Sequence, residues 1–221
     1  MARPTRPTPR DWIETAPLTD SVRALARRGE LCRFGKGSVL IQEGAVGDTL
    51  YIVLEGRLRV FGSTMSSERE ITYGTYGPGE YIGEMGLDGG PRSASVMALE
   101  TTVCAMITRR TLEQHLREDS DFAFELLAKV IRRARLATLS AKTMALNDVY
   151  GRLKQLLESL AEPRADGSRG LPERSTHQDL AHRLGCSREM VTRLLRDLQA
   201  GGYLTAVRGQ ITLLKALPPR W

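Results

Sequence analysis

A short segment in the first half of the chain brings together residue types that bind a sugar phosphate. Gly83 and Gly86 permit a backbone that turns N–H groups toward an anion. Arg92 offers a fixed positive charge for a phosphate, and Ser93 adds a hydroxyl donor. Glu84 cannot serve the phosphate itself, but its carboxylate could accept hydrogen bonds from sugar hydroxyls. Together these residue types indicate a site for a ribose cyclic phosphate. The alternative is a glycine hairpin with a surface Glu–Arg pair.

A second segment, near the C-terminus, has the pattern of two short helices around a tight turn. Thr176 can cap the first helix, with Asp179 three residues on as in a capping box. Gly185 can end that helix in a left-handed conformation, and Ser187 can cap the next one. Apolar residues at helical spacing predict the inward faces: Leu180, Ala181, Leu184, Val191, Leu194, Leu195 and Leu198. The pattern is typical of a helix-turn-helix.

The outward face of the second helix carries side chains that can read base edges: Arg188, Glu189, Thr192 and Arg193. Arginine can donate two hydrogen bonds to guanine, and glutamate can accept one from cytosine. A recognition helix makes its base contacts from its N-terminal residues. These features favour DNA binding over a solvated charged face on an ordinary helical hairpin.

The chain continues with two alternating apolar and polar runs, within residues 202–214, on either side of Arg208 and Gly209. This pattern predicts a β-hairpin with a glycine turn. A hairpin packed on a helix-turn-helix is a wing, and Arg208 at its tip could contact a phosphate. The alternative is a surface arginine that is only solvated.

Composition limits the class of protein. The chain has 221 residues, which suits two domains, and basic residues exceed acidic ones by six, which suits a polyanionic partner. An aromatic fraction of 5% argues against recognition of single strands by stacking. Cys32, Cys104 and Cys186 are scattered and fit neither zinc-ligand spacing nor an iron–sulfur cluster, so we expect reduced thiols, no metal and a cytoplasmic location. The longest apolar stretch near the middle, Leu50–Leu54, is too short to span a membrane.

The region from Glu30 to about Ile107 alternates short β-prone runs with glycines, which predicts an antiparallel sandwich or jelly roll. The expected strands include Val39–Ile41, Leu50–Leu54, Leu58–Phe61, Ile71–Tyr73 and Val103–Ile107. A short helix at about Arg110–Arg117 closes this region. Residues 1–10 are rich in arginine and proline and have no apolar core, so we expect a disordered tail rather than a signal peptide.

A long helix is expected to begin near Asp121 and to reach Asn147. It carries an apolar stripe at alternating spacings of three and four: Leu127, Val130, Ala134, Ala137, Ala141 and Met144. Such a stripe indicates a coiled-coil seam between two copies of the chain. The alternative is that the stripe packs on its own domain. A second helix is expected through Leu153 and Leu160, and a loop from Glu162 to Glu173 follows it.

The segment Gly79–Val96 resembles the phosphate-binding cassette of the cyclic-AMP receptor protein / fumarate-nitrate regulator (CRP/FNR) family. The run Cys186–Glu189, with Arg193, resembles the DNA reader of that family. The similarity covers nearly the whole chain after Asp11 and is closest to the cyclic-AMP receptor branch. It implies an α+β chain with three parts in order: a jelly-roll cyclic-nucleotide-binding domain over residues 11–118, a dimerisation helix over 119–147, and a winged helix-turn-helix domain over 148–221.

The resemblance also implies a ligand site composed of Gly83, Glu84, Met85, Arg92, Ser93, Ala94, Arg133 and Thr138. Glu84 would hold the ribose 2′-hydroxyl, and Arg92 and Ser93 would hold the cyclic phosphate together with nearby backbone N–H groups. Arg133 would lie near Glu84 and the ligand. Thr138 matches a position that reaches the purine from the partner subunit.

One position departs from the cyclic-AMP pattern. In the cyclic-AMP receptor, the position before the one that Thr138 matches is a threonine that contacts adenine. In this chain that position is Ala137. Cyclic AMP is the first expected ligand and cyclic GMP the second, and the alternative is cyclic di-GMP or no control by a nucleotide. The oxygen-sensing and haem branches are disfavoured because the chain lacks a cysteine cluster and has histidine only at 115, 177 and 182.

For DNA, the resemblance implies that Arg188, Glu189 and Arg193 read a TGTGA-like half-site. The expected contact set is Thr176, Ser187, Arg188, Glu189, Thr192, Arg193 and Arg208. The implied function is a bacterial-type transcription regulator that binds palindromic double-stranded DNA as a homodimer, with RNA polymerase as a further partner. A regulatory subunit for another protein is a second hypothesis, and the helix-turn-helix and wing argue against it. An enzyme is a third, and no nucleophile–base pair is visible, so no catalytic residue is expected.

Overall fold

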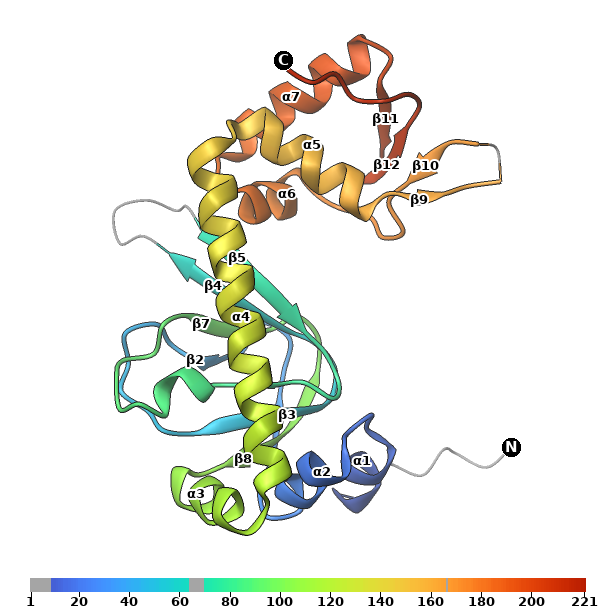
Figure 1. Ribbon diagram of the computed structural model, residues 1–221. Coiled ribbons are helices and arrows are strands. Elements are labelled where there is room, and N and C mark those ends of the chain that lie inside the picture. Colours follow the sequence, from blue (N-terminus) through green and yellow to red (C-terminus); the bar gives the residue numbers. More distant parts are fainter. Residues whose placement is uncertain (1–8, 64–69, 166) are drawn as a thin grey trace, which may run out of the picture. The chain divides into compact units, whose positions relative to one another are not determined.

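The computed structural model describes residues 9–63, 70–165 and 167–221, and Figure 1 shows their elements. They divide into two compact units, with a boundary inside the long helix α4 (Ser120–Leu146), between Ile131 and Arg132. Ser63, Glu70 and Ile71 also group with the second unit. Helix α1 (Pro9–Thr15) includes the last two residues of the expected tail, because a proline suits the first turn of a helix. The rest of that tail lies outside the described residues.

The first unit contains two four-stranded sheets, ordered β1-β8-β3-β6 and β2-β7-β4-β5. The strands are β1 (Glu30–Phe34), β2 (Val39–Ile41), β3 (Leu50–Glu55), β4 (Leu58–Ser63), β5 (Glu70–Tyr76), β6 (Tyr81–Ile82), β7 (Ser95–Ala98) and β8 (Thr102–Ile107). Strands β3 and β8 pair antiparallel in the centre of the first sheet, with Ile52 opposite Ala105. The predicted antiparallel sandwich is confirmed.

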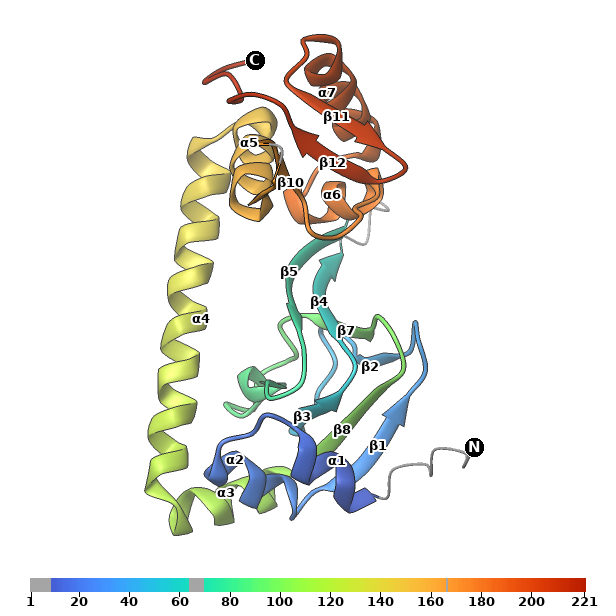
Figure 2. The ribbon, with the colours of Figure 1, turned by 90° about the vertical axis from the view of Figure 1, so that its right-hand side faces the viewer.

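Strand β3 is apolar along almost its whole length because both of its faces are buried. Leu50, Ile52 and Leu54 pack in one buried cluster, whereas Tyr51 and Val53 pack in another. Successive side chains of a strand point to opposite faces of the sheet, so β3 is buried on both faces. One face meets the second sheet, and the other is covered by helices, as Figure 2 shows for the first unit.

Those helices were expected only in part. Helix α3 (Arg109–Glu118) matches the predicted helix within one residue at each end, and α4 matches the predicted long helix. Helices α1 and α2 (Asp20–Ala26) were not predicted. The signal for α2 was present, because Val22, Leu25 and Ala26 have helical spacing and all three are buried.

The apolar stripe of α4 is exposed to solvent in the single chain. Leu127 is 54% exposed, Val130 40% and Met144 43%. These exposures argue against the hypothesis that the stripe packs on its own domain. The helix also exposes large apolar side chains outside the stripe, so its apolar surface is wider than a strict coiled-coil seam: Phe124, Ile131, Leu136 and Leu139.

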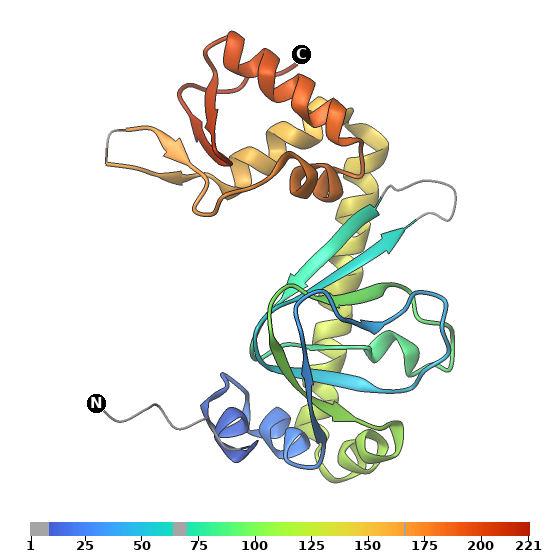
Figure 3. The same cartoon turned by 180° about the vertical axis from the view of Figure 1, so that it is seen from behind.

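The second unit packs three helices on a small antiparallel sheet, ordered β11-β12-β10-β9 (Figure 3). Its elements after α4 are α5 (Val149–Leu160), β9 (Glu162–Pro163), β10 (Arg169–Gly170), α6 (His177–Leu184), α7 (Arg188–Ala200), β11 (Leu204–Val207) and β12 (Gln210–Leu213). One buried cluster joins them, including Leu153 from α5, Leu180 from α6, Leu195 from α7 and Ile211 from β12.

The expected loop from Glu162 to Glu173 is corrected by the structure, because it contains β9 and β10. Arg169 pairs with Pro163 in β9 and with Leu213 in β12. Two-residue strands are too short to show an alternating pattern, so no sequence signal marked them. Among the described residues, no helix has the length and apolar character that crossing a membrane would require.

Candidate functional site

The glycine-rich cassette contains a glycine, Gly83, in a backbone conformation that other residues rarely adopt. Gly83 has φ +93° and precedes η1 (Glu84–Gly86), a single 3₁₀ turn. A Cβ atom at Gly83 would lie 2.6 Å from the carbonyl oxygen of Thr49. The left-handed conformation of Gly83 allows the turn to approach the neighbouring loop.

Gly86 plays a different part from the one expected. Its φ is not positive, so it is not needed for an unusual backbone conformation. A Cβ atom there would lie 2.7 Å from the carbonyl oxygen of Gly47 and 2.9 Å from Nη1 of Arg92. The absence of a side chain at Gly86 therefore makes room for the guanidinium of Arg92.

Arg92 is buried, with 7% of its surface exposed. Its Nη1 donates to the carbonyl oxygen of Gly83 at 2.8 Å, and its Nη2 donates to the carbonyl and hydroxyl oxygens of Thr49 at 2.8 and 3.0 Å. These three acceptors are uncharged, so they fix the orientation of the guanidinium without neutralising it. A buried cation of this kind favours the binding of an anion such as a phosphate.

The other cassette residues divide into buried and exposed sets. Glu84 is buried, with 6% exposed, next to Gly83 in the chain. Met85 and Ser93 are exposed, and Oγ of Ser93 donates to Sδ of Met85 at 3.5 Å. Ala94 is half-buried. The structure therefore joins Gly83 to Arg92 directly and brings Ser93 to Met85 in the middle of the turn.

Arg133 and Thr138 lie on the part of α4 that belongs to the second compact unit, whereas the cassette belongs to the first. Arg133 is half-buried, and Thr138 is exposed. Oγ1 of Thr138 donates to the carbonyl oxygen of Ala134 at 3.0 Å, one turn earlier in the helix. Contact of these two residues with a ligand stays a prediction.

The helix-turn-helix is formed by α6 and α7, with the caps that the sequence predicted. Thr176 and Asp179 form a reciprocal capping box at the start of α6. Gly185 has φ +63° at its end, and Oγ of Ser187 accepts from the backbone N–H of Met190 at the start of α7. All of the inward-facing residues that were predicted for the two helices are buried.

The outer face of α7 presents charged side chains. Arg188, Glu189 and Arg193 are exposed, as a base-reading face requires. Thr192 differs, because its hydroxyl is held within the protein. Its Oγ1 donates to the carbonyl oxygen of Arg188 and lies 2.9 Å from Nδ1 of His177. No sequence pattern marked His177, because its contact is with a residue of a different helix.

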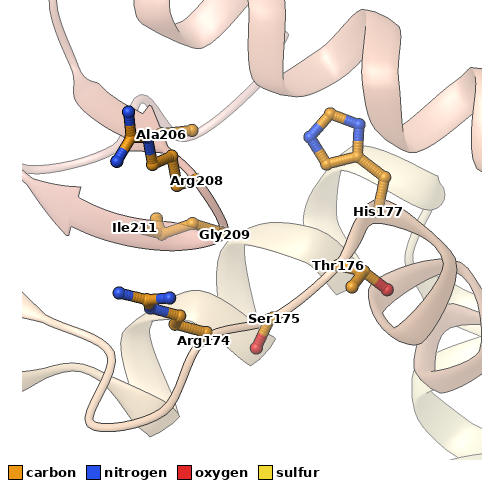
Figure 4. A pocket seen from close by; sticks show the side chains of 8 residues that line it. All are labelled: Arg174, Ser175, Thr176, His177, Ala206, Arg208, Gly209 and Ile211. Atoms are coloured by element: carbon orange, nitrogen blue, oxygen red, sulfur yellow. The ribbon is translucent and has the colours of Figure 1, made fainter.

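The wing hairpin β11–β12 turns at Arg208 (φ +50°) and Gly209 (φ +82°). Two consecutive positive φ angles define the type I′ turn that matches the twist of paired strands. A hollow of about 400 Å³ lies between this turn and the start of α6 (Figure 4). Its lining consists of Arg174, Ser175, Thr176, His177, Ala206, Arg208, Gly209 and Ile211.

Two arginines therefore line a hollow between the wing turn and the start of α6, and the sequence had indicated only one of them, Arg208. Arg174 was missed because it precedes the cap of α6 and belongs to no periodic pattern. Elsewhere, the described residues contain no group of three histidine, cysteine, aspartate or glutamate side chains placed to hold a metal ion.

Comparisons with known proteins match both units. Residues 31–119 match the model of the cyclic nucleotide-binding domain, and residues 151–216 match the Crp-like helix-turn-helix domain. The cAMP-activated global transcriptional regulator CRP of Escherichia coli O157:H7 is 30% identical over 178 residues, which is 79% of this chain and 84% of that protein. The CRP-like protein Clp of Xanthomonas euvesicatoria is 32% identical over 191 residues, 82% of each chain.

A solved structure of the c-di-GMP-responsive global regulator CLP of Xanthomonas campestris is also similar. Its TM-score is 0.77 at 27% identity, and the match covers 88% of this chain and 98% of that one. The fold and the two matched domains define a DNA-binding transcription regulator with a cyclic nucleotide-binding domain. The chain belongs to the CRP/FNR family of bacterial regulators.

Proposed function

We propose that the protein is a homodimer whose affinity for DNA is controlled by a cyclic mononucleotide, cyclic AMP first and cyclic GMP second. The observation that carries this proposal is Arg92, a buried guanidinium held by three uncharged oxygens beside Gly83. Such a group can bind one phosphate with its orientation already fixed. The similarity to a regulator named as cAMP-activated supports the first choice of ligand.

The proposed ligand contacts follow from the chemistry of the cassette. Arg92 and Ser93 bind the cyclic phosphate, with the backbone of Gly83, Met85 and Ala94 beside them. Glu84 accepts hydrogen bonds from the ribose hydroxyl. Arg133 and Thr138 on α4 complete the site, Thr138 from the partner subunit.

A second candidate ligand, cyclic di-GMP, has two observations in its favour. Ala137 lacks the hydroxyl that would read adenine, and the similar CLP of Xanthomonas campestris is described as c-di-GMP-responsive. Against it, cyclic di-GMP carries two phosphates, and the cassette residues identified here supply one arginine, Arg92. One fixed cation suits one phosphate better than two, so the cyclic mononucleotides remain first.

We further propose that α4 forms the dimer interface and that residues 119–147 are the dimerisation helix, between a ligand domain over 11–118 and a DNA-binding domain over 148–221. The exposure of Leu127, Val130 and Met144 supports burial against a second copy. Two-fold symmetry would place two recognition helices on a palindromic site, with half-sites roughly 34–36 Å apart.

In each half-site, Arg188, Glu189 and Arg193 read base edges in a TGTGA-like sequence, and the exposure of all three supports this role. Thr176, Ser187 and Arg208 contact the sugar-phosphate backbone. Thr192 faces the bases with its methyl group, because its hydroxyl is bonded to Arg188 and His177. RNA polymerase is the proposed further partner, in the cytoplasm.

Titration calorimetry tests the ligand, with cyclic AMP, cyclic GMP and cyclic di-GMP added in turn to the purified protein. We expect saturable binding of cyclic AMP at one site per chain, and loss of that binding in Arg92→Ala. Binding of cyclic di-GMP alone would replace the proposed ligand. Binding of none of the three would contradict control by these nucleotides and leave the DNA-binding function to be measured separately.

A further inference from the structure

His177, the first residue of α6, has its tautomer fixed by a neighbouring hydroxyl. Oγ1 of Thr192 donates its single proton to the carbonyl oxygen of Arg188 at 2.9 Å, since a carbonyl can only accept. At the 2.9 Å contact between Oγ1 and Nδ1 of His177, the hydroxyl must therefore be the acceptor. Nδ1 of His177 carries the proton, and in the neutral ring Nε2 carries a lone pair.

The imidazole of His177 lines the hollow beside the wing. Figure 4 shows the guanidinium groups of Arg174 and Arg208 on one side of this hollow and the imidazole on the other. His177 also lines a second hollow of about 560 Å³, together with Thr192 and Arg196 of α7. The two hollows are lined by three arginines, Arg174, Arg196 and Arg208, and neither lining contains an acidic side chain. The charge of this surface suits a DNA phosphate.

We propose that His177 is a proton-dependent phosphate contact, through which the protein binds DNA more tightly as the pH falls. This inference rests on the proposed DNA-binding function. A neutral ring would direct the lone pair of Nε2 at a phosphate oxygen, which is repulsive. A doubly protonated ring would instead donate a charge-assisted hydrogen bond from Nε2. Because DNA favours the protonated imidazole, binding of a phosphate at His177 is coupled to uptake of a proton by the ring.

The chain contains three histidines, so the pH dependence can be assigned to one of them. Histidine is the side chain whose charge ordinarily changes between pH 5 and 8. His115 is buried in the first unit, with 1% exposed. His182 lies on α6 one turn after Gln178, whose Nε2 is 2.6 Å from its own Nε2, and it lines neither hollow. His182→Gln is therefore a matched control for His177→Gln.

Fluorescence anisotropy measures the affinity at constant ionic strength at about pH 6 and about pH 8, in the presence of saturating cyclic AMP. One duplex carries two inverted TGTGA-like half-sites, and a second has the same length and an unrelated sequence. We expect the affinity of the unmutated protein to fall about 10-fold from pH 6 to pH 8 on both duplexes, because a phosphate contact does not depend on sequence. His182→Gln should behave in the same way.

His177→Gln should lose most of this pH dependence, and His177→Lys, which stays charged, should bind tightly at both pH values. Thr192→Val should also weaken the pH dependence, because a ring without its acceptor at Nδ1 can donate from Nε2 while neutral. A structural role for Thr192 alone would lower affinity equally at both pH values.

An unchanged pH dependence in His177→Gln, or a loss of it in His182→Gln, would overturn the inference. If the unmutated protein bound neither duplex at either pH, the proposed DNA-binding function itself would fail. That outcome differs from DNA binding that is indifferent to pH, which would overturn only the role of His177.

Discussion

Arginine side chains occupy two kinds of surroundings in this chain, and these suit the two purposes proposed for them. Arg92 is buried and fixed by backbone oxygens, so its position depends on the glycines that make room for it. Arg188 and Arg193 are exposed on α7, where a long side chain can change its conformation to reach a base edge. The same guanidinium chemistry therefore suits a preorganised anion site in one unit and an adaptable reading surface in the other.

Substitutions at the recognition helix should separate base contacts from phosphate contacts. Arg188→Ala and Glu189→Ala should each cost about 1–3 kcal/mol on the preferred site and relax one base position, because each removes one base-edge contact. Arg208→Ala should weaken all sequences alike if it touches only phosphate. Both effects can be measured by selecting binding sites from a pool of random DNA sequences and then titrating the selected sequences. Identical selected sequences for Arg188→Ala and the unmutated protein would contradict the proposed docking of α7.

Cys104 gives a prediction about alkaline stability. Burial between the sheets, with the neighbouring Cys32 thiol as a smaller contribution, raises the pKa of Cys104 from its usual 9.0 to about 12. The folded state therefore retains this proton at a pH where the unfolded chain releases it. The resulting stabilisation is present below about pH 9 and is lost as the pH rises toward about 12.

Urea unfolding of the unmutated protein and Cys104→Ala, at pH 7 to pH 11, measures the effect. We expect the difference in unfolding free energy between them to shrink above about pH 9. Iodoacetamide at neutral pH should leave Cys104 unlabelled in the folded protein, since its side chain is fully buried. Rapid labelling of Cys104 without unfolding would contradict this account.

Some of the candidate site could be predicted from the sequence, and the rest depends on tertiary contacts. The caps at Thr176 and Ser187 follow from residue type and local spacing, and both are present. Gly83 was expected to permit an unusual backbone, and the structure shows a positive φ there. Gly86 was misjudged because its role comes from the approach of Arg92, which only the folded chain shows.

At the scale of the elements, α4 exposes many large apolar side chains, which favours burial of this helix against a second copy of the chain. Ala137→Glu would place two like charges face to face across the proposed seam. We expect this variant to dissociate to a monomer and to lose specific DNA binding, as measured by analytical ultracentrifugation at micromolar concentration and by a gel shift. Arg135→Glu is the control, because it also adds a negative charge to α4 but lies outside the stripe. A monomer in the unmutated protein, with and without ligand, would contradict the dimer.

The elements also show where periodicity stops being informative. The capped helices α6 and α7 and the wing hairpin follow from patterns of at least one full turn or strand, and the structure contains them. Strands β9 and β10 have two residues each, so they form only through strand pairing: β10 pairs with β12, and β9 pairs with β10. Elements of this kind are selected by tertiary pairing rather than by their own sequence.

At the scale of the whole molecule, the α+β order of sandwich, long helix and winged helix-turn-helix could be predicted, because each part has a distinct periodicity. The ligand could not be predicted to the same depth. A phosphate clamp depends on a few charged and small residues, whereas in the proposed site the choice of a base would depend on Thr138 and on position 137, which is alanine here. The sequence therefore identifies the class of regulator in more detail than it identifies the ligand.

Control of DNA binding by the ligand gives the last prediction. A ligand changes an equilibrium only if it binds one state more tightly than the other. In the proposed site, the cassette holds the phosphate and Thr138 of the partner subunit contacts the purine, so the ligand favours the dimer arrangement in which both contacts exist. We expect cyclic AMP to raise the affinity for a palindromic duplex, and cyclic GMP to do so more weakly. Anisotropy titrations with and without each nucleotide measure the change.

Two variants distinguish binding of the ligand from the response to it. Arg92→Ala should abolish the response because it leaves a buried phosphate without its cation, and calorimetry should show that binding is lost as well. Thr138→Ala should reduce the rise in DNA affinity more than it reduces binding of the nucleotide, because its contact exists in only one of the two states. Full-strength DNA binding by Arg92→Ala, indifferent to every cyclic nucleotide, would show that the DNA reader acts without the cassette. Equal losses of binding and response in Thr138→Ala would place that residue in the ligand site without a role in control.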